Sequence, residues 1–109
     1  MSEFTIDRWQ DGCATIRVEG MTDADFDVLV GMMEAYEVYL SRNNEREALW
    51  KRSGVKGQCY ILMAKAERAF RQVMAGQVPN RDHFHDTIVY AAFALALGDN
   101  LNGEWPWKE

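Results

Sequence analysis

The stretch QCYILMAKAERAFRQVMAGQVPNRDHFHDTIVYAAFALAL, residues 58–97, carries the strongest signal for the fold. It holds two segments with apolar residues at helical spacing, joined by a connector that runs from Gly76 to Asn80. Because glycine ends helices and asparagine caps them, the pattern predicts helices over residues 58–75 and 81–97. A connector this short makes the two helices antiparallel neighbours. The apolar stripe of the first helix consists of Cys59, Leu62, Met63, Ala66, Phe70 and Val73.

The second of these helices carries an apolar run from Ile88 to Leu97, in which only Tyr90 offers a polar side-chain atom. A helix that is apolar on most of its sides is usually buried. We therefore expect this helix to be the most buried one, and we expect it to end at Gly98, since glycine favours a helix C-terminus.

A further helix is predicted to begin near Asp23, before the other two. Thr22 and Asp25 have the spacing of a reciprocal helix N-cap. Upstream, residues 14–18 alternate between apolar and polar as a short strand does, and downstream the glycines of residues 53–57 mark a break. The apolar residues of this helix recur at helical spacing and are Phe26, Leu29, Val30, Met33, Tyr36 and Leu40.

Together these signals predict an all-α fold, a small helical bundle of three to four helices with an irregular or short-strand N-terminal arm. The length of 109 residues fits a single domain. In that domain residues 1–21 form the arm and residues 98–109 form an aromatic tail. Trp105 and Trp107 make this tail apolar, so it is expected to pack on the domain or on a partner.

The composition limits the partners and the compartment. With 12 Lys and Arg against 17 Asp and Glu, the net charge is −5, which repels duplex nucleic acid. A free nucleotide remains compatible with this charge, because it needs only a local cluster of cations or a divalent metal. Cys13 and Cys59 lie far apart and are expected to be free thiols of a reducing compartment. No segment has the roughly 20 apolar residues that span a bilayer, so we expect a soluble, cytoplasmic protein.

Two cations and one aromatic residue are candidates for binding a ligand. Lys65 and Arg68 are three residues apart, so they share a helix face on which both could contact one polyphosphate. The same spacing is also typical of a solvated basic surface. Trp50 offers a ring that either stacks on a base or fills the core. His83 and His85 point to different faces of a helix and are not expected to share a metal, although one of them could line a pocket rim.

Several carboxylates are candidate metal ligands. Asp82 and Asp86 are four residues apart, where like charges repel unless a cation lies between them, so they are candidate magnesium ligands. The alternative is that Asp82 serves the helix dipole and Asp86 faces water or pairs with a cation of the preceding helix. Glu34 and Glu37, three residues apart, could also hold a hard cation. Glu37 and Glu47 are the candidates for a catalytic general base.

A series of short motifs follows one order along residues 39–97. A polar turn precedes a Trp, a glycine-rich break follows, Lys-x-x-Arg lies on one helix, and Asp-x-x-x-Asp-x-x-x-Tyr lies on the next. In this order and spacing the segment resembles the nucleotide modification associated domain, a MazG-like family of the all-α NTP pyrophosphatase superfamily. The residues concerned are Arg42-Asn43-Asn44-Glu45, Trp50-Lys51-Arg52, Gly54-Val55-Lys56-Gly57, Lys65-Ala66-Glu67-Arg68, Asp82, Asp86 and Tyr90-Ala91-Ala92.

The resemblance implies an all-α fold related to enzymes, common in phage and bacterial genomes, that hydrolyse nucleoside triphosphates to monophosphate and pyrophosphate with Mg²⁺. It implies that Lys65 and Arg68 contact phosphate, that Trp50 and Tyr90 belong to the substrate site, and that Asp86 binds the metal. Proteins of this group are usually oligomeric, so a homo-oligomer is expected.

Two alternatives remain beside hydrolysis. The Glu-x-x-Glu of the first helix is not followed by Glu-x-x-Asp, so the chain could bind a nucleotide without turnover. It could also be a noncatalytic phage or bacterial protein that binds a host protein or sequesters a nucleotide. Convergence of at least three of the carboxylates on one cavity favours metal chemistry, whereas their dispersal favours an adaptor.

Overall fold

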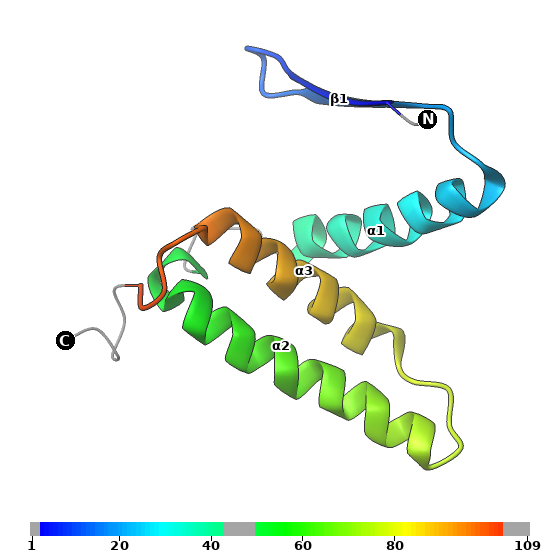
Figure 1. Ribbon diagram of the computed structural model, residues 1–109, viewed down its shortest axis with the longest axis vertical. Helices are drawn as coiled ribbons and strands as arrows, with labels where there is room; N and C mark the ends of the chain where they lie inside the picture. The colour runs from blue at the N-terminus through cyan, green and yellow to red at the C-terminus, as the bar shows by residue number, and fades with distance from the viewer. Residues whose placement is uncertain (1–2, 43–49, 104–109) are drawn as a thin grey trace. The chain divides into compact units, whose positions relative to one another are not determined.

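The computed structural model of the chain describes residues 3–42 and 50–103. Within these residues two strands are followed by three helices, so the chain is mostly helical with a two-stranded N-terminal sheet (Figure 1). This agrees with the predicted fold class in outline. The chain divides into two compact units, Met1–Gly31 and Met32–Glu109. The prediction of a single domain over residues 1–109 stays a prediction.

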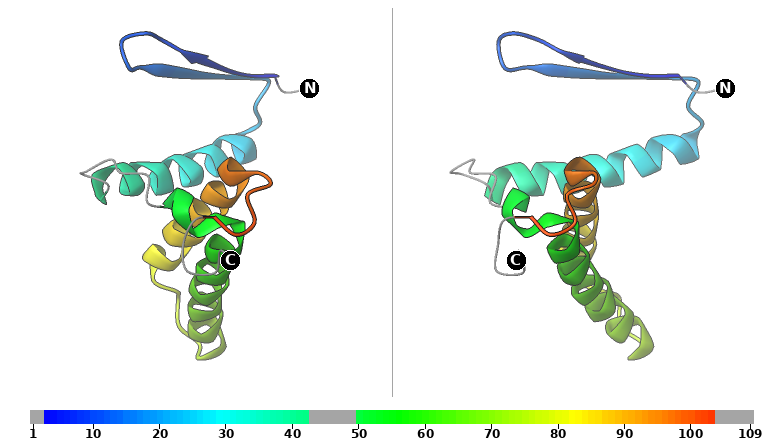
Figure 2. Two further views of the ribbon diagram at one scale, coloured as in Figure 1. Left: turned by 90° about the vertical axis from the view of Figure 1, so that its left-hand side faces the viewer. Right: turned by 60° about the vertical axis from the view of Figure 1, so that its left-hand side comes forward.

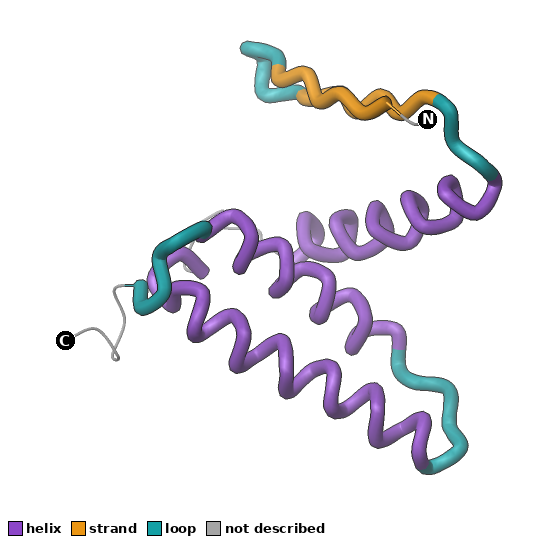
Figure 3. The backbone as a smooth tube through the Cα atoms, in the orientation of Figure 1, coloured by secondary structure: helices purple, strands orange, loops and turns teal. Residues whose placement is uncertain are grey.

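The first unit contains an antiparallel hairpin of β1, Glu3–Arg8, and β2, Ala14–Glu19 (Figure 3). The alternating pattern of the sequence predicts only the second strand. The register pairs Phe4 with Val18 and Ile6 with Ile16. Because side chains alternate along a strand, these four apolar residues share one face of the hairpin. The turn is closed by a hydrogen bond from the Trp9 N–H to the Cys13 carbonyl, at 2.8 Å.

Helix α1, Asp23–Arg42, begins where the sequence predicts. The Thr22 hydroxyl accepts a hydrogen bond from the Asp25 N–H at 3.1 Å, and the Asp25 carboxylate accepts one from the Thr22 N–H at 3.0 Å. This reciprocal pair satisfies two backbone donors that an uncapped helix would leave free. The last part of α1, from Met32 onward, belongs to the second unit.

Helices α2, Trp50–Met74, and α3, Arg81–Leu97, pack side by side and antiparallel in the second unit (Figures 1 and 2). This confirms the predicted pairing, and the bounds of α3 are the predicted ones. The Asn80 side chain accepts a hydrogen bond from the Asp82 N–H at 2.9 Å, which makes Asn80 the predicted N-cap. Gly76 and Gly98 follow the two helices with positive φ angles, as helix-ending glycines do.

Helix α2 begins eight residues before its predicted start, and the predicted break appears inside it as a kink. Gly54 has φ 67° and ψ 178°, which is not helical. The backbone N–H groups of Val55 and Lys56, just after the kink, donate to the carbonyls of Asn100 and Leu101, both at 2.9 Å. The loop that follows α3 thereby supplies the acceptors that the start of the long helical segment lacks.

Burial is sparse in the part of the chain that the structure describes. Ala35 and Ala69 are the only apolar residues there that are buried, and none of the α3 residues is. The expectation that this helix is the most buried one is therefore wrong. Its apolar run extends around the helix, and only part of it meets α1 or α2. Across residues 3–42 and 50–103, no helix has both the length and the apolar character that a bilayer crossing requires.

Candidate functional site

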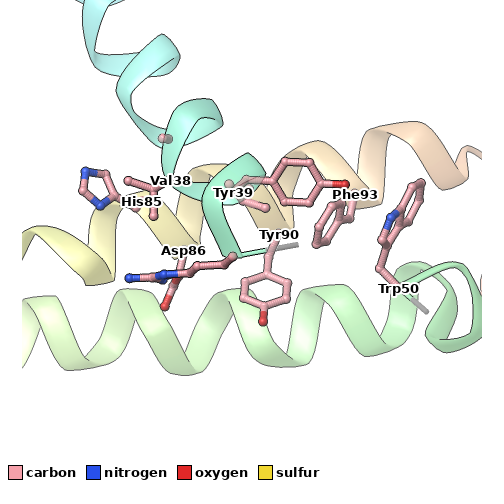
Figure 4. A pocket seen from close by; sticks show the side chains of 10 residues that line it. Val38, Tyr39, Trp50, His85, Asp86, Tyr90 and Phe93 are labelled. Atoms are coloured by element: carbon pink, nitrogen blue, oxygen red, sulfur yellow. The ribbon is translucent and has the colours of Figure 1, made fainter. Parts of the chain in front are cut away.

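A pocket of about 380 Å³ lies between the end of α1 and α3 in the second unit. This volume is within the usual range for small-molecule sites, about 300–1,000 Å³. Figure 4 shows His85 and Asp86 at one end of the pocket and Phe93 and Trp50 at the other. The pocket thus has an ionic end and an aromatic end. Its lining consists of Ala35, Val38, Tyr39, Arg42, Trp50, His85, Asp86, Val89, Tyr90 and Phe93.

The aromatic end is built around Phe93. The Trp50 ring stacks on it with a centroid distance of 4.8 Å and an interplanar angle of 4°. Tyr39 and Tyr90 each meet the Phe93 ring edge-on, with centroid distances of 5.6 Å. Such arrangements place the positive ring edges against the negative faces. The Trp50 ring is half-buried, so it both packs in the structure and keeps a surface in the pocket.

Asp86 is the centre of the ionic end. Its Oδ2 lies 3.1 Å from the Lys65 ammonium nitrogen of α2, and its Oδ1 accepts from Arg42 Nη1 of α1 at 3.3 Å. Arg42 also donates to Asp82 Oδ1 at 3.1 Å. Arg42 therefore lies between the two aspartates, where the sequence analysis expects a cation. The pairing of Asp86 with a cation of the preceding helix, one of the alternatives, is confirmed.

Glu34 forms a second ionic group at the start of the pocket. Arg81 Nη2 donates to both carboxylate oxygens of Glu34 at 2.6 Å, and His85 Nε2 contacts the same carboxylate. These hydrogen bonds, from Arg81 first and His85 second, hold the pKa of Glu34 below its ordinary range. The same contact raises the pKa of Arg81. Each shift stabilises the charged form of its group, so this pair is ionised at neutral pH.

His85 joins the two ionic groups. Its side chain is only 11% exposed, and its Nδ1 lies 3.6 Å from Asp82 Oδ1, beyond hydrogen-bond range. This buried ring nitrogen has no hydrogen-bond partner among the residues that the structure describes. A buried polar atom without a partner is costly, and at the edge of a pocket it is a natural contact for a ligand or a water.

The structure brings together six of the predicted site residues. Trp50, Tyr90 and Asp86 line the pocket, and Asp82 and Lys65 are linked to it through ion pairs. Glu34 adjoins it through His85.

Two other predicted residues lie elsewhere. Glu37 is exposed and is not among the pocket residues, because it lies two residues before Tyr39, about 200° around α1. Arg68 is also exposed and forms no ion pair with a residue that the structure describes, so Lys65 alone of the two cations reaches α3. Glu47, like the tail with Trp105 and Trp107, lies outside the described residues.

Some site residues were missed in the sequence. The sequence presents Arg42 only as part of a motif and indicates no role for Arg81, Tyr39 or Phe93. A signal existed for one set, since Ala35, Val38, Tyr39 and Arg42 recur at the spacing of one helix face. Arg81 carried no such signal, because its partner Glu34 is 47 residues away in the sequence.

The carboxylates suit magnesium by donor type, since it prefers oxygen ligands. They are arranged as a chain in which His85 lies between Glu34 and Asp82, and Arg42 lies between Asp82 and Asp86. Within residues 3–42 and 50–103, no three His, Cys, Asp or Glu side chains gather as a ready-made metal site. A metal ion would therefore have to displace one of the side chains that now lie between these carboxylates.

Searches against known protein families, curated proteins and solved structures find no significant match to the chain. The resemblance of residues 39–97 to the MazG-like family stays a prediction. The residues of the pocket are therefore the basis for a proposed function.

Proposed function

We propose that the chain binds a free nucleotide in the pocket between α1 and α3. The observation that carries the proposal is the division of one pocket into an aromatic end and an ionic end. A nucleotide has the same division, with a flat base that stacks on aromatic rings and a phosphate chain that attracts cations. Trp50, Tyr90 and Phe93 would hold the base. A volume of about 380 Å³ suits a ligand of that size.

Arg42 and Lys65 are the cations that would meet the phosphates. Both already contact Asp86, at 3.3 and 3.1 Å, so they stand side by side at one point of the pocket wall. Arginine binds phosphate oxygens with two parallel hydrogen bonds, and lysine adds a point charge. Arg42 is half-exposed and can turn toward a ligand at little cost. The family-like role of Arg68 in phosphate binding would require the ligand to extend along α2.

Magnesium fits this proposal through Asp82 and Asp86, with Glu34 as a further oxygen donor. When bound, the ion would neutralise the charge of the phosphate chain. An anionic ligand that draws Arg42 and Lys65 away from Asp86 leaves this carboxylate without a counter-charge. The chain's own contribution would be to move the side chains of Arg42 and Lys65 from the aspartates to the phosphates.

We further propose that the end of α1 completes a small bundle with α2 and α3. Support comes from the side chains that reach from residues 32–42 to α3, namely the pairs of Glu34 with Arg81, of Arg42 with Asp82 and Asp86, and of Tyr39 with Phe93. In such a bundle the pocket belongs to the interior side of α1. This is where helical bundles usually place their ligand sites.

Hydrolysis to monophosphate and pyrophosphate is the stronger form of the proposal, and binding without turnover is the weaker one. The weaker form is favoured by one observation, that each of Glu34, Asp82 and Asp86 is engaged by a cation. A general base needs a free lone pair near the attacked phosphorus. Glu37 lies away from the pocket, so Glu47 is the remaining candidate for that role.

The test is a thermal melt of the chain with ribo- and deoxyribonucleoside triphosphates, each with and without magnesium. A ligand that binds only the folded state raises the free energy of unfolding by mass action, by about 2.7 kcal/mol at a hundredfold excess over Kd. The melting temperature rises with it. We expect at least one nucleotide to raise it and magnesium to increase the rise. Pyrophosphate release in the same samples separates hydrolysis from sequestration.

Two variants locate the effect. Lys65→Met removes a cation beside the pocket and should reduce the nucleotide-induced shift, whereas Lys56→Met removes an exposed cation of the same helix and should leave it unchanged. Absence of a shift with every nucleotide would contradict the proposal. Equal loss in both variants would show a general electrostatic effect rather than a site.

A further inference from the structure

The net charge of the chain resides in its first unit. Residues 1–31 contain seven Asp and Glu against two Arg, whereas residues 32–109 contain ten acidic and ten basic residues. The first unit therefore carries the whole net charge of −5, and the second unit, which holds the pocket, has no net formal charge. A concentration of charge of one sign attracts a partner of the opposite sign and repels one of the same sign.

The hairpin in this unit has an apolar face that is open to solvent. Phe4 is 62% exposed, Ile6 58% and Ile16 47%. Val18, opposite Phe4 in the register, completes this face. A two-stranded hairpin alone is at best marginally stable in water, and a third strand or a packed surface is what gives such a sheet stability. The face is therefore suited to receive a further strand.

The outer edge of β1 offers backbone groups for such a strand. In an antiparallel ladder, residue pairs that exchange backbone hydrogen bonds alternate with pairs that do not. The Trp9 N–H donates to the Cys13 carbonyl at the turn, so this pair is a bonded one. Counted back along the register, the backbone N–H and C=O groups of Phe4 and Ile6 therefore point away from β2. Within the described residues β1 has only β2 beside it, and an open edge of this kind is a template for an added strand (Figure 3).

The other face of β1 is acidic. Glu3 and Asp7 lie on it, and neither forms an ion pair with a residue that the structure describes. Glu3 stands directly opposite Glu19 in the register, where like charges repel, and Glu19 already has Arg17 as its partner at 2.7 Å. Arg8, the last residue of β1, lies on the apolar face next to the turn. A strand beside β1 that carries cations on the acidic face would supply the missing counter-charge.

We propose that the outer edge of β1 binds an extended, basic segment of a partner protein, which adds a third strand to the hairpin. In this strand the residues opposite Phe4 and Ile6 are apolar, and the alternate residues, on the face of Glu3 and Asp7, are Lys or Arg. Backbone hydrogen bonds give such a complex its affinity, and the alternation of side chains gives its specificity. The proposal goes beyond nucleotide binding and does not depend on it.

The acidic edge favours a basic partner over a second copy of the chain. Two β1 strands paired antiparallel about Thr5 would place Glu3 of each copy opposite Asp7 of the other, and like charges directly opposite each other are destabilising. Nucleic acid is disfavoured as well, because the first unit carries the whole net negative charge. A Lys- or Arg-rich strand meets neither obstacle.

Fluorescence anisotropy with a labelled octapeptide of alternating Lys and Val, added to the full chain without nucleotide, tests the proposal. N-methylation of the Val residues removes the N–H groups that face β1, since the apolar residues are those opposite Phe4 and Ile6. Loss of two or more backbone hydrogen bonds should raise the Kd by at least about tenfold. N-methylation of the Lys residues is the matched control, because their N–H groups point away from β1, and it should leave the Kd within about twofold. Absence of binding, or equal effects of the two modifications, would overturn the proposal.

Two double variants of the protein locate the peptide on the hairpin. Glu3→Gln with Asp7→Asn removes the acidic face of β1 and should raise the Kd of the unmodified peptide about fivefold, because two cross-strand ion pairs are lost. Asp23→Asn with Asp27→Asn is the matched control, since it removes the same charge from exposed positions of α1 in the same unit. It should change the Kd by less than about twofold. Equal effects of the two variants would mean attraction by net charge alone, and that result would also overturn the proposal.

Discussion

The two sides of α3 have similar apolar content and different polar content. The side that lines the pocket interleaves His85 and Asp86 with Val89, Tyr90 and Phe93, and both His85 and Asp86 meet a charged partner from α1 or α2. The opposite side of α3 consists of Phe84, Ile88, Ala91 and Leu95. These side chains carry no charge and make no polar contact within the described residues.

The difference separates two kinds of surface that a hydrophobic pattern alone cannot distinguish. A small polar ligand is fixed by a few convergent polar groups on an apolar wall. A helix partner is fixed by the repeat of apolar side chains along its length. Substitutions at Gly54, Asp86 and Glu34 test which contacts each side of α3 depends on.

The largest effect is expected at Gly54, because it supports both sides of α3 through α2. Its φ of 67° with ψ of 178° is a conformation that is essentially restricted to glycine, and a Cβ there would stand 2.6 Å from the Leu101 carbonyl oxygen. Gly54→Ala should therefore lower the free energy of unfolding by about 3 kcal/mol or more. It should weaken nucleotide binding as well.

Chemical denaturation with Gly31→Ala as the control checks this. Gly31 lies inside α1, and a Cβ there meets no atom within 4 Å. The alanine should be neutral or should stabilise the chain by up to about 1 kcal/mol, because glycine is a poor helix former. If Gly54→Ala were as mild as Gly31→Ala, the contact between the kink and the loop after α3 would not support the fold.

The second change, Asp86→Asn, should affect the pocket side alone. It leaves Lys65 and Arg42 without their shared counter-charge at a site where Asp86 is about one-fifth exposed. Loss of one partner costs about 3–5 kcal/mol in a fully buried pair. Because this pair is partly exposed, we expect about 1–2 kcal/mol.

Thermal melts of Asp86→Asn and of Asp99→Asn, each with and without magnesium and nucleotide, measure this. Asp99 lies in the exposed turn after α3 and should tolerate the change. A gain in stability for Asp86→Asn would mean that repulsion from Asp82 outweighs the ion pairs, and it would favour the metal-ligand role. A variant that loses stability but keeps its full ligand-induced shift would refute that role.

Local signals in the sequence predicted most of the secondary structure. Thr22 with Asp25 and Asn80 with Asp82 cap helices as their spacing indicates, because a cap depends on residues two or three apart. The start of α2 was misplaced for the opposite reason. Its kink at Gly54 is held by carbonyls of Asn100 and Leu101, which no local window contains.

The site was predicted in part for the same reason. Asp82 and Asp86 were recognised because they are neighbours on one helix, but Arg42, which lies between them, is 44 residues from Asp86 in the sequence. The burial of α3 was misjudged because apolar content does not say what covers a face. The repeat of Phe84, Ile88 and Leu95 is equally compatible with a core and with an interface.

The third change concerns pH and should be the smallest effect, because Glu34 and Arg81 are both well exposed. The pKa of Glu34 is lowered by the hydrogen bonds from Arg81 first and from His85 second. A lowered pKa in the folded state means that the unfolded chain binds more protons between the two values, so stability rises with pH there. The contribution of Glu34 is complete above its ordinary pKa, about 4.3. It is lost as the pH falls through the lowered value.

Melting temperatures of the wild type and of Glu34→Gln should therefore differ at neutral pH and converge as the solution is acidified below about pH 4. Glu37→Gln is the matched control, since Glu37 lies one turn away on the same helix and outside the ionic group. Its melting curve should follow that of the wild type at every pH. A difference between wild type and Glu34→Gln that stays constant with pH would mean that Glu34 acts through packing. In that case the charge of Glu34 would not contribute to the difference between the ionic and the apolar side of α3.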